Sequence, residues 1–477
     1  ILSISTFLKI YSINVDNTEW TRNNVKIVVN ARDRYSGIIK YELINEAGEV
    51  LSTNSMESVR DISESLIKQT LPLEMSVSQN GKYAFKVYDQ AGNSSISSYI
   101  NVTNIDKTAP QITSISSSNT SWTNTDIVIT AKANDGNQSG IVQYQFTNIN
   151  STPTNWVSVT NTNEVTASYT VSENGTYYFF TRDLVGNVSS KAVTISNIDK
   201  VVPTVSIKVT RNGNGNTVNS GSWANDKLNI SVKNDKCGAS GCKVYYCVST
   251  TTCDPNILVN SGETKNITNT GIFNIYYKAV SNAGTTSVVG EYHAKVDITK
   301  PDTITLSSNS DATFLKERTV TVTIKDTGSG LKTLNKFDYG WSTSNSTAPS
   351  IFTTVYPEYV NGTTSATFNV SGSNLNGLYY LWIKPTTYYD VAGNSYSAGN
   401  LVSTGTFAFD NSAPVNVTFN PTSNTTYTKS KTVTLKLADT GAGLAATNTF
   451  KYGWSTSNST APTSYSNVTI NNANGAK

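Results

Sequence analysis

A strand motif that begins at a tryptophan recurs about once every hundred residues along the chain. It reads WTRNNVKIVVNARD from Trp20, WTNTDIVITAKAND from Trp122 and WANDKLNISVKND from Trp223, with spacings of 122 − 20 = 102 and 223 − 122 = 101 residues. In each copy apolar and polar residues alternate, which is the pattern of a strand with one buried face. A repeat of this length predicts a chain of modules that each form one domain.

Two further copies of the strand lack the tryptophan but keep the alternation. They read TVTVTIKDTGSGL from Thr319 and KTVTLKLADTGAGL from Lys431. These two copies are close relatives, because FDYGWSTSNSTAPS at 337–350 returns as FKYGWSTSNSTAPT at 450–463. The strand motif therefore predicts five modules.

A second motif follows near the end of the modules, as YAFKVYDQAGN at 83–93, RDLVGN at 182–187 and YDVAGN at 389–394. We expect a strand that runs into a tight turn, in which the Asp side chain caps backbone amides and the Gly takes positive φ. The predicted turn residues are Asp89, Gly92 and Asn93, then Asp183, Gly186 and Asn187, then Asp390, Gly393 and Asn394. The third copy reads SNAGT at 281–285, and it should still form a turn without the Asp.

A proline-containing joint separates consecutive modules, as NIDKTAP at 104–110, NIDKVVP at 197–203, VDITKP at 296–301 and FDNSAP at 409–414. Proline restricts its own φ and biases the preceding residue toward extended backbone, so we expect short, stiff joints. The predicted domains are 10–105, 106–198, 199–297, 298–411 and an incomplete 412–477, with 1–9 as the end of a preceding module or a linker. Because the last module contains no AGN turn, we expect the chain to be part of a longer protein.

Composition favours an all-β fold. Tyr occurs 26 times against 2 Met and 1 His, a bias that suits half-buried sheets better than helices. Lys and Arg form no basic stripe, so nucleic-acid binding has little electrostatic support. No apolar run approaches the roughly 18 to 20 residues that a membrane-spanning helix needs, so we expect no membrane span in this part of the protein.

Taken together, the D-x-T-x-P-like joint, the alternating strand with its Ser-Gly turn and the D-x-A-G-N turn resemble bacterial immunoglobulin-like domains of the group-3 type. The resemblance covers essentially the whole chain. It implies β-sandwiches in tandem, arranged as an elongated rod, in large secreted or wall-attached bacterial proteins that serve as stalks and adhesin shafts. Such domains usually carry no catalytic residues.

All four cysteines, Cys237, Cys242, Cys247 and Cys253, fall in the third module. They lack the C-x2-C pairs of structural zinc sites and have no His nearby, so disulfides are favoured over metal. We favour the local pairs Cys237 with Cys242 and Cys247 with Cys253, because Cys242 and Cys247 point to opposite faces of one strand. Disulfides would place the chain outside the cytoplasm, secreted or on a bacterial cell surface.

Two acidic turns offer oxygens that calcium accepts, Asp135-Gly136-Asn137 and Asp326-Thr327-Gly328. Neither carries the D-x-D-x-D-G density of a calcium loop, and Asp in such a turn usually caps its own backbone. The capping interpretation is therefore favoured over metal binding, and we expect no metal and no cofactor.

Trp341 and Trp454 lie in the duplicated YGWSTSNSTAP segment and are candidates for an exposed ligand contact, although a strand that ends at a buried Trp explains them nearly as well. The single His293 has no nucleophile motif to serve, so we expect no enzyme. The favoured function is a structural stalk or fibre segment, such as an adhesin shaft or surface appendage, with self-assembly into fibres as one possibility. The alternatives are a module that binds a host or neighbouring-cell glycan or protein, and a spacer in a secreted multidomain enzyme.

Overall fold

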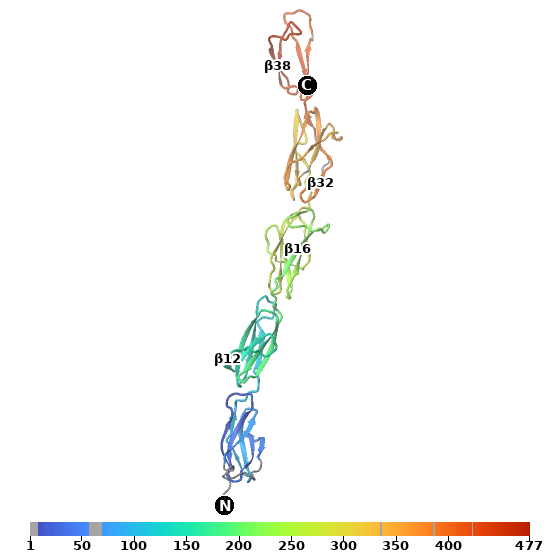
Figure 1. The fold of residues 1–477 in the computed structure, drawn as a ribbon. Coiled ribbons are helices and arrows are strands. Elements are labelled where there is room, and N and C mark those ends of the chain that lie inside the picture. The colour runs from blue at the N-terminus through green and yellow to red at the C-terminus, as the bar shows by residue number, and fades with distance from the viewer. Residues whose placement is uncertain (1–7, 57–68, 334–335, 385–386, 422) are drawn as a thin grey trace. The chain divides into compact units, whose positions relative to one another are not determined.

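The computed structural model describes residues 8–56, 69–333, 336–384, 387–421 and 423–477; most of the predicted leading segment 1–9 falls outside these ranges. In the described part of the chain every regular element is a β-strand, which confirms the all-β prediction (Figure 1). No helix in these ranges is long and apolar enough to cross a membrane. The chain divides into two compact units, one formed by Ile1–Val202 with Cys237–Cys242 and Ser281–Thr285, the other by Pro203–Lys236, Lys243–Val280 and Thr286–Lys477.

The first domain, in the first unit, packs two sheets around one core. The alternating strand predicted from Trp20 onward is β2, whose Val25, Ile27 and Val29 are fully buried. Phe85 and Val87 of β6 pack against them from the other sheet. One sheet has the order β1 (Lys9–Val15), β2 (Val25–Arg32), β5 (Leu71–Val77), and the other has β4 (Val50–Ser55), β3 (Ile38–Asn45), β6 (Gly81–Asp89), β7 (Ser94–Ile96), with β8 (Ile100–Val102) also paired to β6.

The second domain repeats this plan in the same unit. Ile127 and Ile129 of one sheet and Phe179 of the other are fully buried in its core. The sheets are β13 (Glu164–Val171), β10 (Ile127–Asn134), β9 (Gln111–Ser117) and β12 (Val157–Thr162), β11 (Ile141–Thr147), β14 (Gly175–Asp183), β15 (Val188–Ile195).

The third domain belongs mostly to the second unit and again has two sheets around an apolar core. The first sheet is β16 (Thr204–Arg211), β18 (Leu228–Lys236), β21 (Thr264–Ile267). The second is β17 (Trp223–Ala224), β23 (Gly290–Val296), β22 (Gly271–Ser281), β19 (Cys242–Ser249), β20 (Ile257–Val259).

The fourth domain has the most aromatic core, which includes the fully buried Phe337, Tyr388 and Phe409. Its first sheet is β24 (Thr305–Leu306), β26 (Glu317–Lys325), β29 (Ser365–Ser373). The second is β25 (Asp311–Leu315), β34 (Phe407–Phe409), β30 (Gly377–Ile383), β27 (Phe337–Ser342), β28 (Thr353–Val355), with β33 (Leu401–Val402) also on β30. The hairpin of the YDVAGN turn, β31 (Thr387–Tyr389) and β32 (Ser395–Ser397), forms a sheet of its own.

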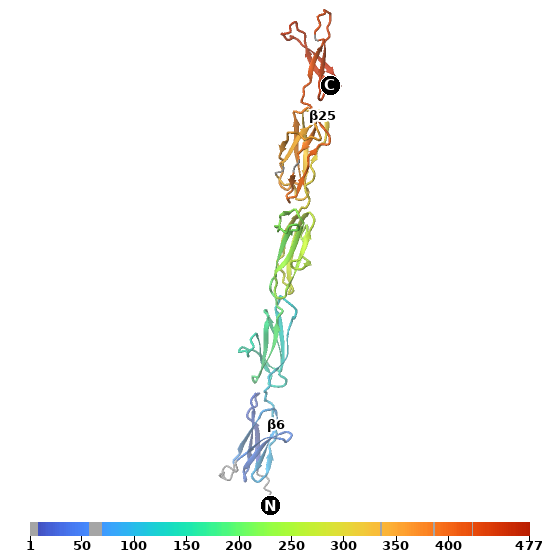
Figure 2. The ribbon, with the colours of Figure 1, turned by 90° about the vertical axis from the view of Figure 1, so that its right-hand side faces the viewer.

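The last segment contains two separate two-stranded sheets, drawn at the red end of the colour range (Figure 2). They are β35 (Val415–Asn420) with β36 (Thr434–Ala438), and β37 (Thr447–Tyr452) with β38 (Ser466–Asn471). In residues 412–421 and 423–477, which the structure describes, there is no counterpart of β30 and β34, the strands that cover the fourth core from the other side.

Candidate functional site

One aspartate at each joint forms hydrogen bonds to the protein on both sides of it. Its backbone amide donates to a carbonyl oxygen of the preceding domain in all four joints: Asp106 to Thr21 at 2.9 Å, Asp199 to Thr123 at 2.8 Å, Asp297 to Ala224 at 2.9 Å and Asp410 to Leu315 at 3.0 Å. Its carboxylate accepts from a backbone amide in the small-residue turn that follows: Ser139 at 3.1 Å, Ser240 at 2.8 Å, Ser329 at 2.7 Å and Ala442 at 2.6 Å. The joint is therefore tied by hydrogen bonds as well as stiffened by proline.

The D-x-A-G-N turn lies next to the joint. Asp183 accepts the Asn187 backbone amide with one carboxylate oxygen and the Asn187 side-chain amide with the other, both at 2.7 Å. Gly186 takes a φ of 95°, as the turn requires. The same Asn187 amide donates to the carbonyl oxygens of Asp106 and Thr108 in the joint, at 3.3 and 3.1 Å. The turn thus closes the hairpin and also binds the preceding joint.

The other two D-x-A-G-N turns have the same geometry. Asn93 bonds Asp89, and Asn394 bonds Asp390, through the backbone and side-chain amides at 2.7 to 2.8 Å. Their glycines, Gly92 and Gly393, also take positive φ, at 91° and 98°. The Asn394 side chain donates to the Asp297 carbonyl oxygen at 2.9 Å, which repeats the contact of Asn187 with its joint.

Three motifs that are far apart in the sequence meet at two of the joints. Asp106, Asp135 and Asp183 each place one carboxylate oxygen within 4.8 Å of the others, and Asp297, Asp326 and Asp390 do the same. We call these sets the first and second aspartate triads. All six side chains are at most 5% exposed. None of the ion pairs in the described part of the chain includes any of them.

Burial and mutual repulsion disfavour the charged form of several triad carboxylates. Burial raises the pKa of Asp135 and of Asp326 to about 6, and the neighbouring carboxylates add to this rise. Burial also raises the pKa of Asp183 and of Asp390, although bonds from Asn187 and Asn394 oppose it. For Asp297, burial is outweighed by hydrogen bonds from Thr299 and Ser329, so its pKa is lowered.

The sequence interpretation made the four triad carboxylates outside the joints caps of their own turns, gave the two joint aspartates no such role, and missed that the three motifs converge. The available signal was the constant distance between the joint Asp and the Asp at the end of the alternating strand. This distance is 135 − 106 = 29, 326 − 297 = 29 and 439 − 410 = 29 residues. Because the same number of residues separates the two aspartates in each copy, their carboxylates are expected to lie at similar positions in each domain.

The third module departs from the triad at two of its three positions. Cys237 stands four residues before Gly241, where Asp326 stands four residues before Gly330, and Ser281 replaces the Asp of the later turn. Cys237 forms a disulfide with Cys242, and Cys247 with Cys253, which are the local pairs favoured from the sequence. Of the three carboxylates only Asp199 remains, and hydrogen bonds from Ser240 hold its pKa below the usual range.

The SNAGT turn keeps its shape without the carboxylate, as predicted. The Thr285 amide donates to Ser281 Oγ at 3.0 Å, and the Ser281 amide donates to the Thr285 carbonyl at 2.8 Å. Gly284 takes the same φ of 95° as Gly186. A hydroxyl therefore suffices to cap this turn.

Trp341 packs at the edge of the fourth core and stays partly exposed, so its role as a ligand contact stays a prediction. Its ring meets Phe407 and Phe409 edge-on, with centroids 5.5 and 5.1 Å apart, and its Nε1 donates to the Ser371 carbonyl at 3.1 Å. Only part of the half-buried ring borders an open hollow of about 470 Å³. The ring is thus neither fully exposed nor fully buried at the end of β27.

Trp454, its counterpart in the last module, is 67% exposed. It borders a cavity of about 400 Å³ together with Phe419, Leu435, Tyr452 and Val468. The difference from Trp341 follows from the strands, because Phe407 and Phe409 belong to β34, which has no counterpart in residues 412–477.

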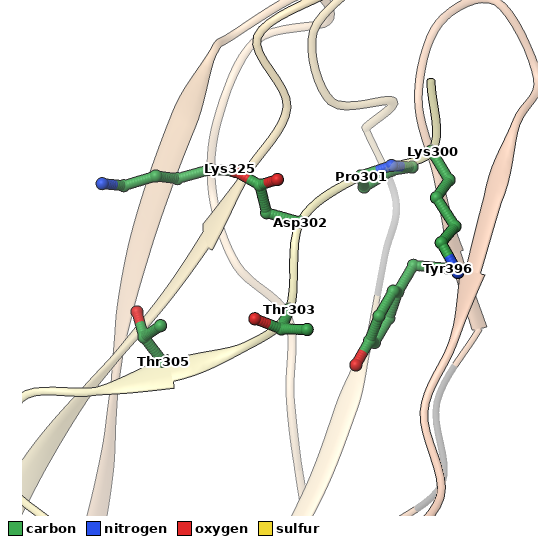
Figure 3. A pocket seen from close by; sticks show the side chains of 7 residues that line it. All are labelled: Lys300, Pro301, Asp302, Thr303, Thr305, Lys325 and Tyr396. Atoms are coloured by element: carbon green, nitrogen blue, oxygen red, sulfur yellow. The ribbon is translucent and has the colours of Figure 1, made fainter. Parts of the chain in front are cut away.

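A third hollow, of about 430 Å³, lies beside the joint that enters the fourth domain (Figure 3). In Figure 3 the Lys300 chain runs next to the Tyr396 ring, whose centroid is 6.0 Å from Nζ, whereas Lys325 extends away from it. The Tyr388 hydroxyl donates to the Asp302 carbonyl and thereby ties this joint to the hairpin β31–β32. These contacts hold the joint against the hairpin.

No protein-family model and no curated protein sequence matches the chain. Among solved structures, the D00-D0 domain of intimin is 11% identical, with a TM-score of 0.24 over 41% of this chain and 98% of that one. Three N-terminal domains of the bacteriophage RB49 outer capsid protein Hoc are 12% identical, with a TM-score of 0.23 over 63% and 99%. Fibronectin(III)-like modules of Clostridium thermocellum CbhA are 15% identical, with a TM-score of 0.19 over 39% and 94%. Similarities this weak carry no argument about function.

Proposed function

We propose that this chain is a non-catalytic structural segment of an extracellular bacterial protein, in which consecutive domains are held at fixed joints. The observation that carries the proposal is the joint aspartate, whose amide binds the domain behind it and whose carboxylate binds the turn ahead of it, in four joints. Free-moving linkers need no such bonds. A stalk, an adhesin shaft or the spacer of a secreted enzyme all use this property.

Two further features support a structural role outside the cytoplasm. The four cysteines form two disulfides, which persist in oxidising compartments. His293, the single histidine of the chain, hydrogen-bonds Asn274 through Nδ1 at 2.8 Å on an exposed strand surface. His293 is therefore not a member of either aspartate triad.

Small-angle X-ray scattering from the whole chain tests the proposal. If the joints are fixed, one arrangement of the domains reproduces the scattering curve of the wild type. The curve of a variant in which all four joint aspartates are replaced by Ala should require a broad ensemble of arrangements; these are Asp106, Asp199, Asp297 and Asp410. A wild-type curve that already requires freely jointed domains would contradict the proposal.

A further inference from the structure

We propose that the first four domains bear tension along the chain, through a parallel pairing between the opening and the closing segment of each domain. The opening segment links the first strand of a domain to its alternating strand, and the closing segment leads into the next joint. We call this pairing the lock. It joins Thr21 to Ile105, Thr123 to Ile198, Trp223 and Ala224 of β17 to Lys295 and Val296 of β23, and Asp311 and Leu315 of β25 to Phe407 and Phe409 of β34. The inference rests on the proposed structural role and adds a mechanical function to it.

The direction of the two segments decides how a pull acts on the lock. A pull on the chain ends draws the opening segment toward the N-terminus and the closing segment toward the C-terminus. Because the two segments run in parallel, they must slide along each other, and the hydrogen bonds that connect them are all loaded together. Strands that are peeled apart from one end lose their bonds one at a time. The parallel pairing therefore resists a pull along the chain.

The lock lies between the pulled ends and the core strand along the chain. In the first domain Thr21 follows β1 and precedes Val25, where β2 begins. A pull that strips β1 from β2 therefore meets the lock before it reaches the core. The Thr21 amide donates to the Asn104 carbonyl, and its carbonyl accepts from the Asp106 amide, both at 2.9 Å. The backbone bond that ties the joint is thus part of the lock.

In the first two domains an asparagine side chain adds two hydrogen bonds to the lock. This asparagine is the first residue of the joint motif NIDK, so the lock gives that residue a role. Its side-chain amide donates to two carbonyl oxygens just before the opening segment. The bonds run from Asn104 to Asn17 and Glu19 at 3.1 and 2.8 Å, and from Asn197 to Asn119 and Ser121 at 3.2 and 2.6 Å.

The third and fourth domains lack this asparagine and have a longer backbone pairing. Two residues before the joint aspartate stand Lys295 in the third domain and Ala408 in the fourth. Their opening segments are the strands β17 and β25, whereas the first two domains have a single bridge. In the fourth domain Arg318 also connects the two segments, because Nε donates to the Ala408 carbonyl at 3.1 Å and Nη1 to Asp311 at 2.6 Å. The asparagine is thus present where the backbone pairing is shortest.

Magnetic tweezers that hold the full chain by its two ends at constant force test the proposal. Unfolding under force is governed by the unfolding rate, and we expect one extension step from each of the first four domains. In the double variant Asn104→Ala, Asn197→Ala, two of the four steps should occur on the order of thirtyfold sooner, because each affected domain loses two hydrogen bonds. The other two steps should keep their wild-type waiting times. Thr103→Ala with Ser196→Ala, the exposed neighbours of the two asparagines, should leave all four steps unchanged.

A core variant separates resistance to tension from ordinary stability. Ile27→Val with Ile129→Val removes one fully buried methylene group from each of the same two domains. It should lower their stability in denaturant, yet shorten the waiting times under force less than the asparagine variant does. Steps of unchanged length show that the variant domains are folded.

Two results would overturn the proposal. One is a set of four unchanged waiting times in the asparagine variant, and the other is a core variant that shortens the waiting times more than the asparagine variant does. Neither result bears on whether the joints are fixed, because fixed joints can connect domains that unfold easily under tension. Scattering and force thus test the proposed function and the lock separately.

Discussion

The carboxylate of Asp106 accepts two hydrogen bonds from Ser139, one from the backbone amide at 3.1 Å and one from the hydroxyl at 2.6 Å. The two residues lie 33 positions apart, one in the joint and the other in the turn after the alternating strand. Both are almost completely buried. The bond from the hydroxyl is therefore made away from water, where a bond to a charged group is worth most.

Ser139→Ala should lower the free energy of unfolding of the second domain by about 1 to 3 kcal/mol, because it removes a hydrogen-bond donor from a buried carboxyl group. Hydrogen exchange of the β10 amides measures this loss within the full chain. Ser114→Ala, on the exposed face of β9, should change it by less than about 0.5 kcal/mol. Equal effects of the two variants would show that the hydroxyl contributes nothing.

The D-x-A-G-N turn can be tested in the first domain. Asp89→Ala should destabilise that domain by about 1 to 3 kcal/mol, because it leaves the Asn93 amides without their acceptor. The double variant Asp89→Ser, Asn93→Thr copies the turn of the third module and should recover most of the loss. Denaturant unfolding, followed by hydrogen exchange of the β6 amides, measures the stability of the single and the double variant. If the double variant is no more stable than Asp89→Ala, the two kinds of turn are not equivalent.

The duplicated tryptophans make a matched pair. Trp341→Ala should destabilise the fourth domain by about 2 to 4 kcal/mol, because it removes edge-on contacts with Phe407 and Phe409. Trp454→Ala, at the same place in a near-identical segment, should cost less than about 1 kcal/mol because its ring is mostly exposed. Thermal unfolding of the two variants checks the difference, and similar costs would contradict the packing assigned to Trp341.

Stability should depend on pH in a direction set by the raised pKa values of two buried carboxyls. The pKa of Asp135 and of Asp326 is about 6 in the folded chain, against about 4 when unfolded. Between these values the folded chain binds more protons, so the free energy of unfolding falls as pH rises from about 4 to about 6. The loss is on the order of 2 kcal/mol per carboxyl.

Unfolding at pH 4.5 and pH 7 measures this pH dependence. Replacing Asp135 and Asp326 by Asn should flatten it. Equal pH dependence of the free energy of unfolding in the wild type and the double variant would contradict the prediction.

The periodicity of the sequence was sufficient to predict the strands, because alternation forces one face of each strand inward; Val25, Ile27 and Val29 are all fully buried. The turns could be predicted because Asp, Gly and Asn act locally, within four residues. For the triads, the constant 29-residue distance signals only two of the three members, Asp106 and Asp135 in the first triad. The third, Asp183, is brought to them only by strand pairing over long loops. Trp341 and Trp454 are alike in sequence and differ in exposure, because neighbouring strands decide burial.

The central claim, that the joint aspartate fixes one domain against the next, is tested most directly by a distance distribution across one joint. Spin labels at the exposed positions 52 and 170, in the first two domains, allow this distribution to be measured by pulsed electron paramagnetic resonance with the native disulfides intact. A single narrow distribution in the wild type that broadens markedly in Asp106→Ala is the predicted result. A wild-type distribution as broad as that of Asp106→Ala would contradict the account.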